Sequence, residues 1–405
     1  MPELTIDRSF AEGLDRSDSL ASVRQQFEID PAGPIYLDGH SLGRLPKRVR
    51  ERLHAVIDED WARDLVASWD EWVDWPLAVG DRLGTALLGA APGQVAAADS
   101  TTINLFKVAS AVLARQPGPL VTDRTNFPTD RYVLQGLAQA AGVEMRLIDV
   151  ERDTGPQPDL IERAVEGASL VCLSSVDFRS GAVAPMLEIN EVCKRAGARV
   201  LWDLSHAVGA VPVELDASGA ELAVGCTYKY VNAGPGSPAF VYVRKELQAE
   251  LRQPIWGWFG QREMFVMGPE YDPVEGIGQF VAGTPSILGL AALDAAVAVL
   301  ADAGIRELRR KGMALVGYAS DLIEARLGEF GVVLGGPRRP ELRGSHVSMH
   351  HPDAYNLGDA LSKEGVMGDV RPPDLLRFGL APAYTRFVDV WDAVDKLTAL
   401  LRRNG

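Results

Sequence analysis

The chain has 405 residues, of which 47% are hydrophobic and 24% charged, and its formal net charge at pH 7 is −14. This length exceeds one ordinary core and predicts a large domain with a smaller one. The composition is typical of a globular enzyme. Because an acidic chain repels phosphate backbones, we expect no nucleic acid partner, while a local basic pocket for a small anion stays open.

Cysteine usage and apolar stretches bear on the compartment. Cys172, Cys193 and Cys226 form no CxxC pair, which is typical of reduced thiols in a cytosolic protein. The stretch MPELTIDRSF has no apolar signal core. The longest apolar stretch, ILGLAALDAAVAVLADAGI, is interrupted by two aspartates and predicts a buried helix. We therefore expect a cytoplasmic protein with neither a membrane nor a metal partner.

The middle of the chain alternates short apolar runs with amphipathic stretches such as TDRYVLQGLAQAAG (129–142) and MLEINEVCKRAGA (186–198). Continuous apolar strands alternating with helices predict a mostly parallel sheet that is covered on both faces. Ligands bind such sheets beyond the carboxyl ends of the strands. The predicted strands are GPLVTD (118–123), EMRLIDV (144–150), SLVCLSSV (169–176), ARVLWDLS (198–205), LAVGCTY (222–228) and AFVYVR (239–244).

The regular alternation of strand and helix patterns ends at about residue 290. A long predicted helix is followed there by mixed strand and helix patterns and by a final helix, FVDVWDAVDKLTALLRR. We predict a large domain over residues 46–290. A smaller α+β domain is predicted from residues 1–45 together with residues 291–405, because the first segment, with IYLDGHSLGRLP, precedes the parallel region.

Two strand ends carry the main chemical signal. Lys229 follows a strand between Tyr228 and Tyr230, where confinement would make an otherwise solvated lysine a usable nucleophile and base. Asp203 also follows a strand and is either a helix cap or a site residue, and His206 three residues later is either structural or part of the same pocket. Pyridoxal phosphate (PLP) needs a lysine for its Schiff base and a carboxylate at its pyridine nitrogen, which this pair would supply.

Two further segments fit the same cofactor. Ser100, Thr101 and Thr102 stand at the start of a predicted helix, where hydroxyls and free N–H groups form either an anion site or a simple N-cap. In NFPTDRY, Phe127 is either a core aromatic or a ring that stacks on a flat cofactor, and Asp130 is an N-cap by position.

Segments in the same order along nearly the whole chain resemble the kynureninase family, whose members use PLP and have the aspartate-aminotransferase fold, fold type I. The resemblance implies a large domain with a mostly parallel seven-stranded sheet between helices, and a smaller α+β domain. The most distinctive segments are GCTYKYVNAGPG and NFPTDRY; the others are YLDGHSLG, DSTTINLFK, WDLSHAVGAVPVEL, GWFG, GTPSIL, RGSHVSMHH, GVMGDVRPPDLLRFGLAPAYT and DVWDAV.

The resemblance also implies the activity and the residue roles. The activity is hydrolytic Cβ–Cγ cleavage of L-kynurenine or 3-hydroxykynurenine, in tryptophan catabolism or NAD biosynthesis. Lys229, Asp203, Tyr228 and His206 would be catalytic, with Tyr228 and His206 both open as the general acid or base. The cofactor would also contact Thr101, Thr102, Phe127, Asp130 and Ser174; the substrate would contact Ser41, Trp69 and Arg377; and Trp258 and Thr284 would reach the cofactor phosphate of the other subunit in a homodimer with shared sites.

Three positions depart from the family pattern, and two other functions are alternatives to a kynureninase. His40 stands where the family usually has Asn, and Asp177 and Phe178 stand where Asn and Tyr are commoner, which bears on preference for the substrate ring. A cysteine desulfurase or selenocysteine lyase would need a late mobile cysteine, but the last one here is Cys226. A non-catalytic binding protein would be expected to have lost the lysine or the aspartate.

Overall fold

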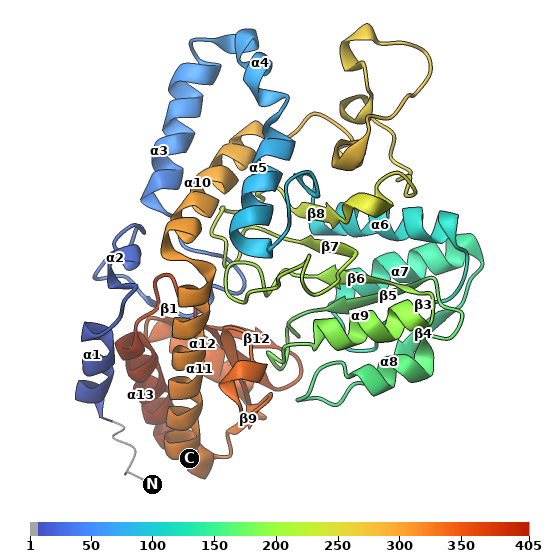
Figure 1. Ribbon diagram of the computed structural model, residues 1–405. Helices are drawn as coiled ribbons and strands as arrows, with labels where there is room; N and C mark the ends of the chain where they lie inside the picture. Colours follow the sequence, from blue (N-terminus) through green and yellow to red (C-terminus); the bar gives the residue numbers. More distant parts are fainter. Residues whose placement is uncertain (1–6, 405) are drawn as a thin grey trace.

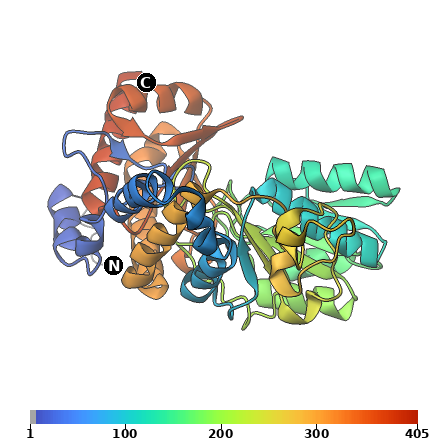
Figure 2. The ribbon, with the colours of Figure 1, turned by 90° about the horizontal axis from the view of Figure 1, so that it is seen from above.

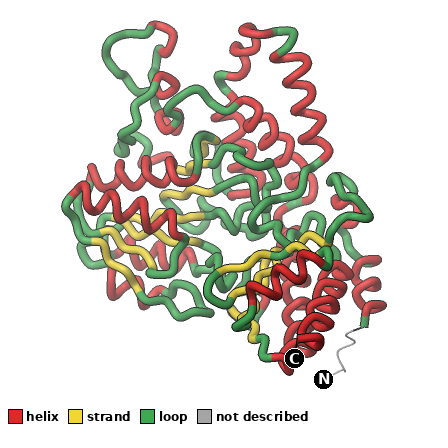
Figure 3. The backbone as a smooth tube through the Cα atoms, turned by 180° about the vertical axis from the view of Figure 1, so that it is seen from behind, coloured by secondary structure: helices red, strands yellow, loops and turns green. Residues whose placement is uncertain are grey.

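The computed structural model describes residues 7–404, which fold around two sheets (Figures 1 and 3). The larger sheet has seven strands in the order β2-β8-β7-β6-β5-β3-β4. All six predicted strands are present, and only β8 runs antiparallel to its neighbours. The seventh strand, at one edge, was absent from the predicted runs. The strands are β2 (Val95–Ala97), β3 (Leu120–Asp123), β4 (Met145–Ile148), β5 (Leu170–Ser174), β6 (Arg199–Asp203), β7 (Leu222–Gly225) and β8 (Phe240–Val243).

The apolar runs form strands because both faces of this sheet are buried. Successive side chains point to opposite faces, so in β5 Leu170 and Cys172 lie in the core under helices α6 and α7, whereas Val171 and Leu173 lie in the core under α8, α9 and α10. The helices that cover the sheet are α6 (Thr101–Arg115), α7 (Pro128–Ala141), α8 (Pro158–Ala164), α9 (Met186–Arg195) and α10 (Ile287–Ala303).

The second sheet is antiparallel, in the order β12-β13-β10-β9. Figure 2 shows it with its helices to one side of the large sheet. A separate pair joins the two ends of the chain, because β1 (Ile35–Tyr36) lies parallel to β11 (Val366–Met367). The other elements of this region are β9 (Val333–Gly335), β10 (His346–His350), β12 (Asp369–Arg371), β13 (Leu375–Gly379), α1 (Arg8–Arg16), α11 (Ile305–Leu327), α12 (Ala354–Lys363) and α13 (Phe387–Asn404).

The segment between β1 and β2 is helical and packs against α10. The predicted domain boundary near residue 290 falls inside α10, so the division into residues 46–290 and the remainder stays a prediction. The helices of this segment are α3 (Lys47–Ala55), α4 (Trp69–Trp72) and α5 (Trp75–Leu83), with the π-helical turns η1 (Val56–Trp61) and η3 (Gly84–Leu88). The short helix α2 (Ala21–Arg24) lies before β1.

Short 3-10 turns connect the remaining elements. The predicted buried apolar helix is α10, most of whose residues are buried. Cys172, Cys193 and Cys226 are free and buried. Among residues 7–404 no single helix is long and apolar enough to cross a membrane. Helices α10 and α11 reach the required length and apolar composition only when they are taken together, and a bend of 77° separates them. The turns are η2 (Leu65–Ser68), η4 (Lys245–Leu247), η5 (Trp258–Gly260), η6 (Met264–Val266), η7 (Gly276–Phe280), η8 (Gly328–Phe330) and η9 (Pro340–Leu342).

Candidate active site

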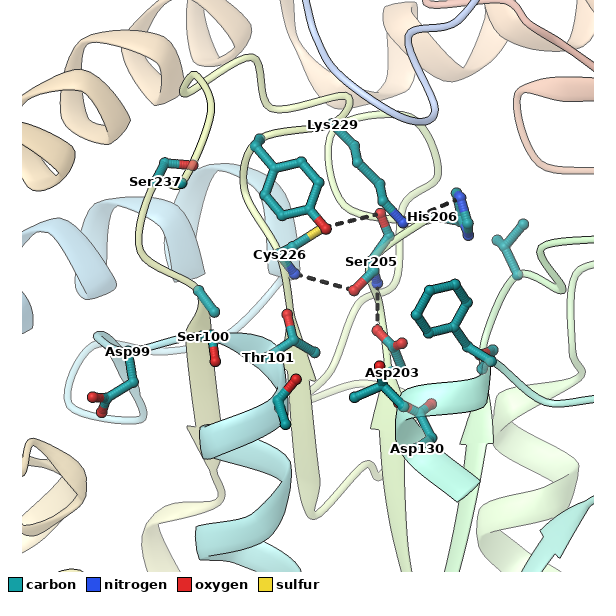
Figure 4. Close-up of a pocket in the computed structure, with 18 residues that line it drawn as sticks. Asp99, Ser100, Thr101, Asp130, Asp203, Ser205, His206, Cys226, Lys229 and Ser237 are labelled. Carbon is teal, nitrogen blue, oxygen red and sulfur yellow. Dashed lines mark hydrogen bonds between the residues drawn. The ribbon is translucent and has the colours of Figure 1, made fainter. Parts of the chain in front are cut away.

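A cavity of about 210 Å³ lies beyond the carboxyl ends of β5, β6 and β7, where a parallel sheet binds its ligands. We call it the strand-end cavity. Nine predicted site residues line it together: Thr101, Thr102, Phe127, Asp130, Ser174, Asp203, His206, Tyr228 and Lys229. Figure 4 shows the Lys229 side chain entering from above, while Asp203 and Asp130 project from the opposite side.

Lys229 follows β7 by four residues and is only 8% exposed. Its Nζ lies 3.3 Å from His206 Nε2 and 5.7 Å from the centre of the Phe127 ring. The loop is held close to the N-terminal segment, because Gly43 N–H donates to the Tyr228 carbonyl at 2.7 Å. A Cβ at Gly43 would overlap the Lys229 carbonyl oxygen, so only glycine permits this approach. The sequence thus confines the amine inside the cavity.

Two carboxylates lie close together on the side of the cavity opposite Lys229 (Figure 4). Asp203 ends β6, and its Oδ1 accepts a hydrogen bond of 2.8 Å from Ser205 N–H. Asp130 is 1% exposed, and neither of its oxygens makes a well-aligned hydrogen bond to a described residue. Burial, and next the Asp203 charge, raise the Asp130 pKa well above its ordinary value. The predicted N-cap role of Asp130 is wrong: Phe127 is the N-cap of α7, and Asp130 lies inside the first turn.

His206 and Tyr228 are both held in their neutral forms. Burial, followed by the Lys229 charge, lowers the His206 pKa well below its ordinary value. Its Nε2 also lies 3.2 Å from the His40 carbonyl oxygen. Burial raises the pKa of Tyr228, so the phenol keeps its proton at neutral pH. A neutral imidazole can accept a proton, and a protonated phenol can donate one.

The far end of the cavity suits an anion. Helix α6 begins at Thr101, and the Ser100 hydroxyl caps it by accepting from Ile103 N–H. Thr101 and Thr102 are therefore its first two helical residues, whose backbone N–H groups have no partner within the helix. Free N–H groups and the positive end of the helix dipole attract phosphate. Ser237 lies across from this helix end in Figure 4 and lines the same cavity.

These groups fit PLP on an observation independent of any family. The buried, unpartnered Asp130 and its neighbour Asp203 call for a positively charged donor, which a protonated pyridine nitrogen provides. The confined Lys229 amine lies across the cavity from that pair, and the α6 N-terminus is left for a phosphate. The Phe127 side chain borders the space between them and meets Phe178 edge-on, with ring centres 5.4 Å apart.

Five predicted residues do not line the strand-end cavity. Ser41 lies on the loop after β1, and Arg377 is buried in β13. Trp69 packs edge-on against Trp72, with ring centres 5.4 Å apart. Trp258 is 41% exposed and Thr284 is also exposed, so within one chain neither reaches this cavity. Their assigned contacts stay predictions.

Ser205 and Ser237 are among the cavity residues that the sequence analysis did not identify. Ser205 was passed over between Asp203 and His206, although its N–H orients the Asp203 carboxylate and its hydroxyl accepts from Cys226 N–H at 3.1 Å. Ser237 stands in the GPGSP turn, and its hydroxyl contacts that of Thr227 at 2.7 Å. The glycine-rich turn after Lys229 was the available signal for Ser237, because such turns bring the backbone and small hydroxyls close to a ligand.

Comparison with known proteins bears on the fold and on the family of the chain. The kynureninase C-terminal domain model matches residues 308–397, and that of the DegT/DnrJ/EryC1/StrS aminotransferase family matches residues 120–217. In solved structures, an apo cysteine desulfurase from Thermococcus onnurineus NA1 superimposes with a TM-score of 0.84 at 20% identity, covering 95% of this chain and 98% of that one. A cysteine desulfurase from Escherichia coli gives a TM-score of 0.81 at 18% identity, covering 95% and 99%. These likenesses confirm the predicted fold type I and say nothing about the reaction.

Curated relatives are much closer in sequence. A kynureninase from Burkholderia pseudomallei (strain K96243) is 43% identical over 404 residues, covering 97% of this chain and 95% of the relative. A kynureninase from Pseudomonas fluorescens is 43% identical over 401 residues, covering 96% and 94%. Identity of this level over almost the full length of both chains, with the lysine and two carboxylates gathered in one cavity, means that the chain belongs to the kynureninase family.

Proposed function

We propose that this protein is a PLP-dependent kynureninase. It hydrolyses the Cβ–Cγ bond of L-kynurenine, or of its 3-hydroxy form, to give anthranilate, or 3-hydroxyanthranilate, and L-alanine. The observation that carries the proposal is the confined Lys229 amine opposite the Asp203 and Asp130 carboxylates in one cavity, in a chain of this family. When bound, PLP supplies an electron-accepting ring that stabilises negative charge next to the substrate nitrogen.

The chain's own residues would hold the cofactor at three points. Lys229 would bond to its aldehyde carbon, and Asp203 with Asp130 would keep its ring nitrogen protonated. Phe127 borders the cavity where it can stack on the ring. Thr101, Thr102 and Tyr228 would bind the phosphate at the N-terminus of α6, with Ser174 at the ring edge. The Lys229 amine would also move a proton at the substrate α-carbon, with neutral His206 3.3 Å away.

Hydrolysis needs a proton donor or acceptor beside the substrate ketone, where water adds before the carbon–carbon bond breaks. Tyr228 and His206 remain the two candidates. The raised Tyr228 pKa favours the phenol as an acid, and the lowered His206 pKa favours the imidazole as a base. Water oxygen ends in the new carboxylate of anthranilate, and the released three-carbon fragment takes up a proton to become alanine.

A homodimer with shared sites is the proposed assembly. Trp258 and Thr284 are exposed in the single chain and do not line its own cavity, which fits residues that serve the other subunit. Exposed apolar side chains surround Trp258: Trp256, Phe265, Val266 and Met267 are 65%, 68%, 72% and 78% exposed. Large exposed apolar surface of this kind is typical of an interface between proteins.

The substrate-pocket roles of Ser41, Trp69 and Arg377 belong to the same proposal. Arg377 would bind the substrate α-carboxylate, because a guanidinium fork matches a planar carboxylate. A cytoplasmic location is proposed from the three free thiols. The ratio of kcat/KM for kynurenine and 3-hydroxykynurenine would show which ring form is the preferred substrate. The same ratio would distinguish a role in tryptophan breakdown from one in NAD supply.

The direct test is to mix the purified, PLP-loaded protein with L-kynurenine and record anthranilate fluorescence and L-alanine. We expect both products in equal amounts. Protein that carries the cofactor, as judged by its visible absorbance, but releases no anthranilate from either ring form would overturn the substrate assignment while leaving the cofactor assignment intact.

A further inference from the structure

Three buried histidines, His40, His206 and His346, lie close together next to Lys229. His40 is 1% exposed, and its ring stacks on that of His346 with centres 5.3 Å apart and an interplanar angle of 18°. The His206 ring is 6.1 Å from that of His40. The reaction outlined above uses His206 but gives His40 no role, and no described residue makes an aligned hydrogen bond to either His40 ring nitrogen. Buried polar atoms of this kind need a partner.

Two carboxylates approach the His40 ring from opposite ends. Asp38 Oδ1 lies 3.2 Å from Nδ1, and Asp369 Oδ2 lies 3.7 Å from Nε2. The side chain of Asp369 is 9% exposed. The ring therefore bridges the loop after β1 to strand β12, two segments more than 300 positions apart in the sequence.

Asp369 in turn holds Arg377. The two residues are direct partners in the antiparallel pair of β12 and β13, and the Arg377 Nη2 donates to Asp369 Oδ2. The other end of the guanidinium, Nη1, donates to the Phe178 carbonyl. Arg371 binds the second oxygen of Asp369 at 3.1 Å. The orientation of Arg377 thus depends on where the Asp369 carboxylate is fixed, and His40 lies on the same carboxylate oxygen.

The backbone is shaped to admit this ring. A Cβ at Gly379 would overlap His40 Nδ1, so β13 can pass beside the imidazole only because this position is glycine. Gly379 N–H donates to the Leu37 carbonyl at 2.7 Å, which fixes the loop that carries His40 against β13. The ring is therefore held in place by the fold.

The arrangement of Asp38, His40 and Asp369 suits a shared proton on the imidazole better than a bound metal ion. Ligand atoms of Asp38, His40 and Asp369 lie within 4.8 Å of one another. However, the two carboxylates face different nitrogens of one ring, and Asp369 is already paired with two arginines, Arg371 and Arg377. Burial lowers the His40 pKa well below and raises the Asp38 pKa above their ordinary values. A neutral imidazole that carries its proton on Nε2 directs this N–H toward Asp369 and leaves Nδ1 as an acceptor that faces Asp38.

We propose that His40 is a positioning residue for Arg377: its Nε2–H fixes the Asp369 carboxylate, which sets the guanidinium for the α-carboxylate of an amino acid substrate. The inference rests on the proposed function, in which Arg377 binds that carboxylate. It predicts that loss of the Nε2 contact weakens substrate binding and leaves the chemical step largely unchanged.

Two amide substitutions distinguish the contact at Nδ1 of His40 from the contact at Nε2. In His40→Asn the amide reaches only the position of Nδ1, whereas in His40→Gln it reaches that of Nε2. We expect the KM for L-kynurenine to rise about tenfold in His40→Asn with kcat within about threefold of wild type, and His40→Gln to recover most of the loss. The dissociation constant of L-alanine, measured by its effect on the cofactor absorbance, should change in the same proportion. His350→Asn, on the same strand as His346, is the matched control and should change neither value.

Several outcomes would overturn the proposal: an unchanged KM in His40→Asn, equal impairment in His40→Gln, or a fall in kcat at constant KM. If His40→Asn does not fold, Asp369→Asn tests the same contact, and a normal KM and L-alanine affinity in that variant would also overturn it. Should wild-type protein fail to release anthranilate, the proposed function fails, while the L-alanine titrations still decide whether His40 acts on Arg377.

Discussion

The strand-end cavity contains a buried polar group without a well-aligned hydrogen bond, whereas the segment of residues 255–284 exposes apolar side chains. In the cavity, Asp130 is buried, and its two oxygens make no well-aligned hydrogen bond to a described residue. In the segment, which Figure 1 draws in gold above the sheet, Trp256 and Met267 are exposed. A buried polar group without a partner and a large exposed apolar patch both cost free energy. The first is relieved by a charged ligand and the second by another protein surface.

The difference shows how one chain can build most of a site and still leave part of it to a second copy. Lys229 and Asp203 are held by strands β7 and β6 of the same sheet, so the single chain places both. Trp258 stands on a short turn outside the sheet, where its position relative to any cavity is set by what covers the segment. The predictions below test this contrast, beginning with the largest effect.

Replacement of Lys229 by Ala should abolish kynurenine cleavage, by about 10⁴-fold or more, because both the covalent bond to the cofactor and the proton transfer are lost. Anthranilate release and the visible absorbance of the cofactor measure the two losses. Lys194→Ala, an exposed lysine on α9, should behave as wild type. Retention of normal turnover by Lys229→Ala would show that the cavity is not the reacting centre.

Replacement of Asp203 by Asn should lower kcat by about 10²- to 10³-fold, because in the proposed site the ring nitrogen would lose the carboxylate that keeps it protonated. The amide oxygen can still accept from Ser205 N–H, so the fold should be preserved. Steady-state kinetics and a circular dichroism spectrum measure the two properties. Asp159→Asn, an exposed change on α8, is the control. A kcat close to that of wild type would contradict the assigned role of Asp203.

Replacement of Trp258 by Ala should weaken PLP binding by about tenfold if the residue serves the other subunit. Mixing inactive Lys229→Ala protein with Trp258→Ala protein should then restore one complete site in each mixed dimer, up to about a quarter of wild-type activity. Trp256→Ala, which removes a neighbouring exposed ring that stacks on Tyr271, is the control for cofactor binding. If mixing restores nothing beyond the sum of the two proteins, the shared site is wrong.

The smallest effect concerns stability at the end of β3. Burial raises the pKa of Asp123 to about 6, although hydrogen bonds from Thr125 oppose the change. The folded state therefore holds a proton that the unfolded state releases between about pH 4 and 6, so this group lowers the free energy of unfolding as pH rises through that window. Asp123→Asn should remove a penalty on the order of 2 kcal/mol at pH 8 and little at pH 4.

Urea unfolding of wild type and Asp123→Asn at the two pH values measures this difference. Asp149→Asn is the control, because its carboxylate lies on the surface and pairs with Arg124. An equal stability change for Asp123→Asn at both pH values would mean that the buried carboxylate does not titrate as described.

Much of the strand-end cavity could be predicted because it depends on local sequence. The apolar runs set the strands, and the polar residues directly after them fall at one edge of a parallel sheet. Lys229 and Asp203 follow neighbouring strands, so their meeting needed only the order of β6 and β7. From its position alone Asp130 was predicted as a helix cap, and only the family resemblance placed it at the cofactor, because the local sequence does not show the buried carboxylate of Asp203 near it.

The sequence by itself therefore determined the apolar strands, the family and nine of the residues that line the strand-end cavity, since these depend on residue type and spacing. Only the tertiary structure decided what depends on contacts between distant segments. It placed β1 beside β11, ran β8 antiparallel, and brought His40 between Asp38 and Asp369. No local pattern encodes such contacts, because the packing of the two sheets against the N-terminal segment sets which side chains meet.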